Sequence, residues 1–162
     1  MKVSHEFDSV VYPDSKVLIL GTIPSVKSRE SGFYYMHPQN RFWSIISFLF
    51  DEDIPASISD KKEFLKKHKI ALWDVLNSCD IVGSSDSSIK NPIVNDIGEV
   101  IKKSQVDTIF VNGKKAFYLY NKYCLDEVGI VAKYLPSTSP ANRSISDEDI
   151  KDKYKEILKY LI

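Results

Sequence analysis

Aromatic side chains alternate with amides, hydroxyls and cations in one segment of the chain, residues 21–43. The aromatic members are Phe33, Tyr34, Tyr35 and Trp43. The amides and cations are Lys27, Arg29, Gln39, Asn40 and Arg41. Aromatic rings stack on nucleobases, while amides and cations bind base edges and phosphates. The segment is therefore a candidate nucleic-acid site, and the competing interpretation is a loop that packs onto its own aromatic residues.

A second segment, residues 135–144, is rich in proline and in small hydroxyl side chains. Pro136 and Pro140 stiffen it, and the hydroxyls between them leave backbone amides open. Arg143 adds a cation. Such a loop can lie against a phosphate backbone. A plain turn ahead of a helix explains the same residues.

The elements that position these segments follow from the apolar pattern. Short apolar runs predict buried strands at 17–20, 70–75, 108–111 and 130–135. Helical spacing predicts helices at 41–50, 60–68, 96–104 and 114–124, and a last helix after the cap Ser146 with a buried stripe that reaches Leu161. Strands that alternate with helices indicate a three-layer α/β/α sandwich with a central, mainly parallel four-stranded sheet.

Three segments lie outside this pattern, at 22–40, 77–92 and 136–145, and we expect them to be loops. Each follows a predicted strand. Because ligands of such folds bind at the carboxyl ends of parallel strands, we expect the functional site where these segments meet.

Length and composition narrow the class of protein. The 162 residues fit a single domain over 1–162, with 43% hydrophobic residues and no run long enough to span a membrane. The polar start is not a secretory signal, so we expect a cytoplasmic protein. Cys79 and Cys124 are too few for a disulfide scaffold or a four-thiolate zinc site, and the three histidines lack metal spacing. Signatures of a P-loop, a nucleophile elbow and a dinucleotide site are absent.

The charge is balanced, with 22 basic and 22 acidic residues, which argues against a protein that coats nucleic acid by bulk electrostatics. The distribution is uneven. Residues 23–43 hold three cations and one acid, whereas residues 79–100 hold four acids and one lysine. A modestly basic working face therefore fits the sequence, and we expect DNA binding with a shallow salt dependence.

Several motifs together resemble the hypoxanthine-DNA (deoxyinosine) glycosylases, a family of the uracil-DNA glycosylase superfamily. The resemblance rests on the runs 21–30, 32–35 and 37–43, and continues in order through 71–76, 78–79, 83–89 and 135–142. These runs span most of the chain. The run 37–43, His-Pro-Gln-Asn-Arg-Phe-Trp, is also similar to the mismatch-specific uracil/thymine glycosylases.

The resemblance implies hydrolysis of an N-glycosidic bond in DNA, foremost the release of hypoxanthine, without a metal or a cofactor. It implies that Asn40 orients the water, that Asn112 binds the extruded base and that Tyr35 stacks on it. Gly21, Thr22 and Ile23 begin the first motif and are expected to line the base site. Mismatch-type enzymes carry a water-activating Asn where this chain has Ile23, and this difference separates the chain from the uracil branches.

The resemblance also implies a partner, double-stranded or single-stranded DNA with a damaged base, bound by a monomer without membrane contact. The last loop matches the motif that grips DNA beside the flipped nucleotide. The residues expected at the DNA are Pro24, Ser25, Lys27, Arg41, Ser137, Thr138, Ser139, Pro140, Asn142 and Arg143.

Alternatives remain for both the site and the function. Asn40 precedes a helix and can be its N-cap, Asn112 precedes Gly113 and can be a turn residue, and Tyr35 can belong to the core. Asp74 ends a strand, but no histidine or second acid is evident as its partner, so we interpret it as structural. A uracil-preferring or mismatch-specific glycosylase and a non-catalytic nucleic-acid-binding relative are the competing functions.

Overall fold

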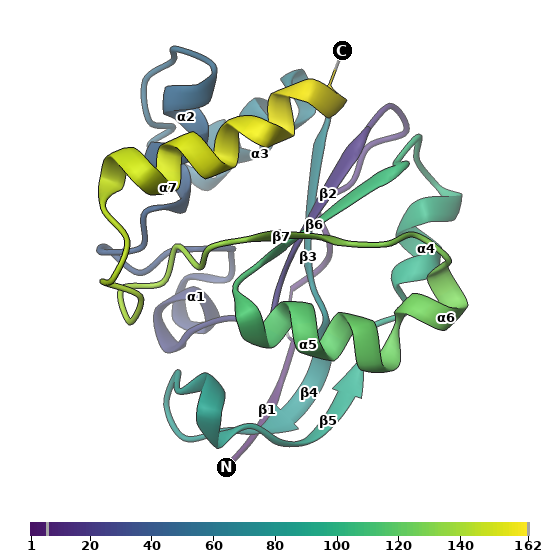
Figure 1. Ribbon diagram of the computed structural model, residues 1–162. Helices are drawn as coiled ribbons and strands as arrows, with labels where there is room; N and C mark the ends of the chain where they lie inside the picture. The colour runs from purple at the N-terminus through teal and green to yellow at the C-terminus, as the bar shows by residue number, and fades with distance from the viewer. Residues whose placement is uncertain (6, 162) are drawn as a thin grey trace.

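A parallel four-stranded sheet forms the centre of the computed structural model, which describes residues 1–5 and 7–161 (Figure 1). Its strands are β2 (Val17–Gly21), β3 (Ile70–Asp74), β6 (Thr108–Asn112) and β7 (Lys133–Leu135), in the order β3-β2-β6-β7. The three neighbouring pairs are all parallel, with Gly21 opposite Asp74 and Asn112 opposite Leu135. The predicted α/β/α sandwich is confirmed.

Alternate side chains of β2 point to the two faces of the sheet and belong to two separate cores. Leu18 and Leu20 pack with residues of α4 (Ile97–Lys102) and α5 (Lys114–Tyr123), and α6 (Leu125–Val128) lies on the same side. Val17 and Ile19 pack with residues of α2 (Phe42–Leu49), α3 (Ile58–Lys67) and α7 (Asp147–Tyr154). All five β2 residues are buried, because a central parallel strand is covered on both faces.

The structure adds a second sheet that was not predicted. Strands β1 (Lys2–Ser4), β4 (Leu76–Asp80) and β5 (Lys90–Val94) form an antiparallel sheet in the order β1-β4-β5. The prediction of a loop over 77–92 was therefore wrong for both of its ends. β4 carries the polar residue Asn77 and β5 carries Lys90 and Asn91, so both strands lack the continuous apolar run that marks the central strands.

Other boundaries also differ from the prediction. The last strand begins at Lys133, not at residue 130, because Ile130 to Ala132 do not pair with β6. The first predicted loop contains a short helix, α1 (Val26–Ser31), which Ser25 caps through its side chain. The last helix is α-helical only to Tyr154 and continues as a 3-10 helix, η2 (Lys155–Tyr160). No helix in the described ranges is long and apolar enough to cross a bilayer.

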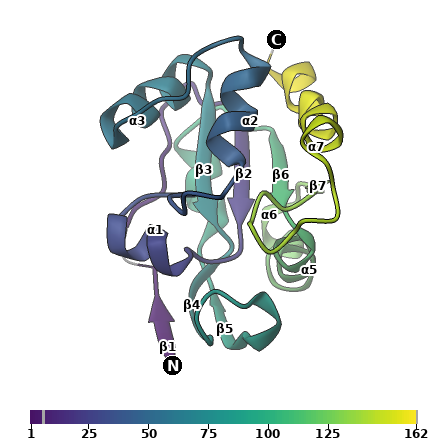
Figure 2. The same cartoon turned by 90° about the vertical axis from the view of Figure 1, so that its left-hand side faces the viewer.

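The carboxyl ends of the central strands lie on one side of the molecule, together with α1 and the segment between β7 and α7. This side is at the left in Figure 1 and faces the viewer in Figure 2. The segment between β4 and β5, which includes the short 3-10 helix η1 (Asp86–Ser88), lies below it. The three segments predicted to meet at the strand ends therefore do so.

Candidate functional site

A cavity of about 640 Å³ lies at the carboxyl ends of β2, β3 and β6. Three segments enclose it, from the β2–α2 connection, the β4–β5 connection and the segment after β7. Twelve residues that the sequence singled out line it together: Gly21, Thr22, Ile23, Pro24, Ser25, Tyr35, Asn40, Asn112, Ser137, Thr138, Ser139 and Pro140. Residues more than a hundred positions apart in sequence thus form one site.

Asn112 is buried at the end of β6 with its amide held in one orientation. Its Oδ1 accepts a hydrogen bond from the backbone N–H of Thr138 at 3.0 Å, and its Nδ2 donates to the Thr138 hydroxyl at 3.0 Å. A backbone N–H can only donate, so this pairing determines which amide atom is the oxygen. The bonds to Thr138 leave one Nδ2 hydrogen unused.

Asn40 lies just before helix α2 and lines the cavity at the same time. Its Oδ1 accepts from the backbone N–H of Phe42 at 2.9 Å, which satisfies one free donor of the first helical turn. The N-cap residue is Arg41, which makes no side-chain cap bond, so the prediction of Asn40 as the N-cap was wrong in position, although its side chain does bond to the start of the helix. Because an amide oxygen has two lone pairs, one acceptor site of Oδ1 remains beside this bond.

Tyr35 contributes an aromatic wall. Its ring stacks on Phe42, with centroids 4.2 Å apart and planes 20° apart, and its backbone has a positive φ of 56°. A left-handed conformation is rare for such a bulky residue and is found mainly where the surroundings enforce it. The hydroxyl is buried without a hydrogen-bond partner in the described ranges. Burial and the charge of Asp74 raise the pKa of Tyr35, and the side chain of Asn112 opposes this shift only in part, so the hydroxyl stays protonated.

Asp74 lies at the floor of the cavity, at the end of β3 beside Gly21. Its Oδ2 accepts a hydrogen bond from the ring of His5, with Nε2 at 2.8 Å. The prediction that Asp74 has no histidine partner was therefore wrong. The sequence did not reveal His5 as the partner, because it lies 69 positions away from Asp74. A side chain at Gly21 would clash with Asp74 Oδ1 and would lie 3.2 Å from the Tyr35 hydroxyl. Glycine is thus required where these groups converge.

The sequence of this chain matches a known protein family. The family model described as the uracil DNA glycosylase superfamily matches residues 9–162. The chain belongs to the uracil-DNA glycosylase superfamily.

Two curated relatives within this superfamily cover most of the chain. One, named hypoxanthine DNA glycosylase, is from Methanosarcina acetivorans and is 34% identical over 150 residues, which cover 89% of this chain and 91% of the relative. The other carries the same name, is from Methanosarcina barkeri and is 32% identical over 142 residues, which cover 85% and 87%. A solution NMR structure from M. acetivorans, named as a candidate uracil DNA glycosylase, superimposes with a TM-score of 0.84 at 31% identity and covers 99% of both chains.

Four residues expected at the DNA do not line the cavity of this superfamily member. The guanidinium of Arg41 forms hydrogen bonds within the protein, to the carbonyl oxygens of Asn142 and Ile145 and to the carboxylate of Asp147. Asn142 closes its own loop by donating to the Ser137 carbonyl. Lys27 and Arg143 are exposed, and their side chains contact Glu30 and Gln39 respectively.

The β4–β5 connection was expected at the site as a segment, but none of its residues was named as a site residue. Ile81, Val82, Ser84, Ser85, Asp86 and Ser87 line the cavity from this side. Ser84 accepts from the backbone N–H of Val26, so the rim is tied to α1. Burial and the charge of Asp74 raise the pKa of Asp86, and Lys115 opposes this shift. The matched run 83–89 was the signal in the sequence that could have found this rim.

Within the described ranges, no group of three or more His, Cys, Asp or Glu side chains is arranged to hold a metal ion. The polar side chains that line the cavity are amides, hydroxyls, the imidazole of His37 and the carboxylates of Asp74 and Asp86. Such a set can orient a water molecule and form hydrogen bonds to a planar polar ligand.

Proposed function

We propose that the chain is a monofunctional DNA glycosylase that releases hypoxanthine from deoxyinosine. The observation that carries this proposal is the meeting of Asn40, Tyr35 and Asn112 in one cavity at the strand ends. Its volume of about 640 Å³ lies within the range of small-ligand pockets, roughly 300–1,000 Å³. The two curated relatives, both named hypoxanthine DNA glycosylases, support the choice of base.

The deaminated nucleotide has to leave the duplex to reach this cavity. Flipping costs a few kcal/mol and costs least for a badly paired base. Hypoxanthine is such a base when it lies opposite thymine. Tyr35, supported from behind by Phe42, would stack on the flipped base, which by analogy with other base–aromatic contacts contributes about 1–3 kcal/mol.

Hypoxanthine presents an O6 acceptor next to an N1–H donor. The free Nδ2 hydrogen of Asn112 suits O6, and the carboxylate of Asp74 suits N1–H. Adenine has the reverse pattern, an amino donor beside an unprotonated N1. The amide of Asn112 cannot turn over to accommodate adenine without losing both bonds to Thr138. We therefore propose that Asn112 and Asp74 together select against adenine.

Asn40 is the proposed water-orienting residue. In the reaction the water oxygen bonds to C1′ of the sugar, the bond from C1′ to N9 breaks, and the base leaves with the electron pair and takes up a proton. An amide oxygen is too weak a base to deprotonate water outright, but it can position water against an oxocarbenium-like centre. The acceptor site of Oδ1 not used by Phe42 would do this.

The DNA contacts are proposed on the rim of the cavity. Pro24, Ser25, Ser137, Ser139 and Pro140 line the cavity, and the exposed cations Lys27 and Arg143 flank the same loops. The serine hydroxyls and the two cations are suited to phosphates. We propose that duplex and single-stranded DNA both bind and that a monomer suffices. The buried free thiols of Cys79 and Cys124 fit a reducing cytoplasm.

The decisive experiment incubates the protein with labelled DNA that contains a single deoxyinosine, deoxyuridine or adenine at one position, followed by alkali to cleave abasic sites. We expect cleavage at deoxyinosine, in duplex and single strand, and none at adenine. Cleavage restricted to deoxyuridine would replace the hypoxanthine assignment by the uracil alternative. Binding without cleavage of any strand would favour the non-catalytic relative.

A further inference from the structure

His5 lies behind Asp74 at the floor of the cavity, and the proposed reaction assigns it no role. The residue follows β1, and the family model begins only at residue 9. Its side chain is 1% exposed. Its backbone N–H donates to the carbonyl of Asn77 at 2.6 Å, which extends the pairing of β1 with β4. The ring is thus brought to β3 by the second sheet.

The hydrogen bonds of the ring define which nitrogen carries the proton. Nε2 lies 2.8 Å from Asp74 Oδ2, and a carboxylate at this position accepts. Nδ1 is buried and has no hydrogen-bond partner in the described part of the chain. A protonated Nδ1 would be an unsatisfied buried donor, which costs free energy. The arrangement therefore favours hydrogen on Nε2.

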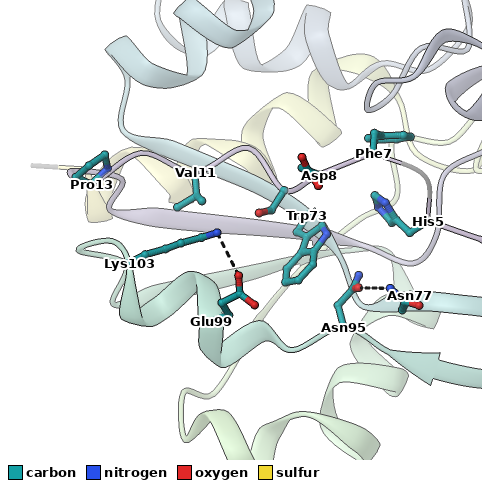
Figure 3. A pocket seen from close by; sticks show the side chains of 11 residues that line it. His5, Phe7, Asp8, Val11, Pro13, Trp73, Asn77, Asn95, Glu99 and Lys103 are labelled. Carbon is teal, nitrogen blue, oxygen red and sulfur yellow. Dashed lines mark hydrogen bonds and ion pairs between the residues drawn. The ribbon is translucent and has the colours of Figure 1, made fainter.

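Aromatic neighbours hold the ring in place. Phe7 lies 4.7 Å from it and Tyr34 lies 5.8 Å from it, measured between ring centroids. The other side of His5 borders a second cavity of about 660 Å³, where Figure 3 shows His5 and Phe7 at one end and Trp73 between them and Lys103. His5 and Asp74 therefore form the wall between the two cavities.

We propose that His5 is a positioning residue of the base pocket, which holds Oδ2 of Asp74 so that Oδ1 stays over Gly21 as a fixed acceptor for the base. The inference rests on the proposed function, because Asp74 needs a base to bind. Without the Nε2–H bond, the Asp74 carboxylate can rotate away from Gly21 and the Tyr35 hydroxyl. Stability alone is a weak explanation for the buried His5–Asp74 pair, because apolar side chains of similar volume can often replace such a pair without loss of folding free energy.

The test compares His5→Leu, which removes the donor, with His5→Gln, whose amide nitrogen can take the place of Nε2. Single-turnover rates are measured on duplex DNA with one deoxyinosine, and thermal melting reports folding. We expect His5→Leu to lower the rate about 10- to 100-fold, the effect of a lost bond to a charged acceptor. His5→Gln should restore the rate to within about fivefold of the unmodified protein.

A double-variant cycle separates positioning from general structural damage. In an Asp74→Ala background, His5→Leu should change the rate by less than about twofold, because the group it positions is gone. An undiminished loss in that background would overturn the proposal. So would a folded His5→Leu protein with the unmodified rate, or a folded His5→Gln protein as slow as Asp74→Ala.

Nitrogen-15 NMR of the unmodified protein gives an independent readout that does not depend on a folded variant. We expect the His5 ring to show hydrogen on Nε2 and an unprotonated Nδ1. Hydrogen on Nδ1 alone would contradict the proposed bond to Asp74.

His68 supplies the matched control, since its Nε2 also bonds to a carboxylate, that of Glu52, and neither residue lines the cavity. His68→Leu should leave the rate unchanged in a folded protein. Failure of the proposed function would appear differently, as an unmodified protein that releases no base. Normal release by the unmodified protein together with an unaffected His5→Leu variant would remove only the inference about His5.

Discussion

Both polar atoms of the Asn112 side chain bond to one residue, Thr138. The Nδ2 donates to the Thr138 hydroxyl and Oδ1 accepts from the Thr138 backbone, each at 3.0 Å, across 26 positions of sequence. Both residues are buried. The end of β6 and the segment after β7 are thereby joined at the site, and the orientation of the Asn112 amide is fixed.

Replacing Thr138 by valine removes the hydroxyl acceptor but keeps the backbone donor. A buried Nδ2 hydrogen then lacks a partner, so we expect a loss of about 1–3 kcal/mol in the free energy of unfolding and a slower release of hypoxanthine. Thr138→Ser keeps the hydroxyl and should behave nearly as the unmodified protein. Urea unfolding and single-turnover kinetics measure the two effects, and equal behaviour of both variants would argue against this role of the hydroxyl.

Serine at position 40 can separate the bond to the start of α2 from the proposed orientation of water, because its hydroxyl can accept from a backbone N–H but cannot place water in the same way. Asn40→Ser should retain most of the stability that the bond to Phe42 contributes, whereas Asn40→Ala should lose about 1 kcal/mol. We expect both variants to lower the single-turnover rate about 100-fold or more. If Asn40→Ser kept the full rate, Asn40 would act only through its bond to Phe42 at the start of α2.

Gly21 leaves space that the site requires. In Gly21→Ala the new methyl group would clash with Asp74 Oδ1, and the central position of β2 prevents the backbone from moving away. We expect a loss of about 1–3 kcal/mol in the free energy of unfolding, and reduced base release. Gly98→Ala on α4 is the control, because its nearest contact, Asp96 Oδ1, is at 3.4 Å, and alanine favours a helix. Similar effects of both changes would contradict the crowding at Gly21.

We expect the loss of Arg41 to lower the stability of the protein and the loss of Arg143 to weaken DNA binding. Arg41→Ala removes hydrogen bonds to Asn142, Ile145 and Asp147, so we expect about 1–3 kcal/mol less stability. Arg143→Ala should leave stability nearly unchanged and lower the salt dependence of DNA binding by about one phosphate contact. Unfolding curves and binding titrations at several salt concentrations check both. The reverse pattern would assign the DNA contact to Arg41.

The raised pKa of Asp86 predicts that DNA binding depends on pH. Burial and the charge of Asp74 raise its pKa, so it takes up a proton at a higher pH than an ordinary aspartate. An ionised Asp86 at the rim repels phosphates, and binding should therefore tighten as the pH falls through its pKa. In Asp86→Asn this tightening should be smaller. Anisotropy titrations with a non-cleavable abasic analogue measure it, and identical pH curves would refute a role for Asp86.

The central strands were predictable because each is a short apolar run buried on both faces of the sheet. Val17 to Leu20 and Thr108 to Val111 show this pattern directly. β4 was not predictable in the same way, because Asn77 and Asp80 interrupt its apolar residues. β1 is three residues long, and its pairing with β4 joins segments almost eighty positions apart. Local pattern carries no information on such a contact.

For the site, the sequence by itself determined the residue types, the loops that hold them and, through motif similarity, the superfamily. Tertiary structure decided which atoms of these residues face the cavity. Asn40 and Asn112 are amides in any conformation, but only packing assigns one oxygen to Phe42 and the other to Thr138. Likewise, only the fold brings His5 to Asp74, since a hydrogen bond between distant segments depends on the register of both sheets.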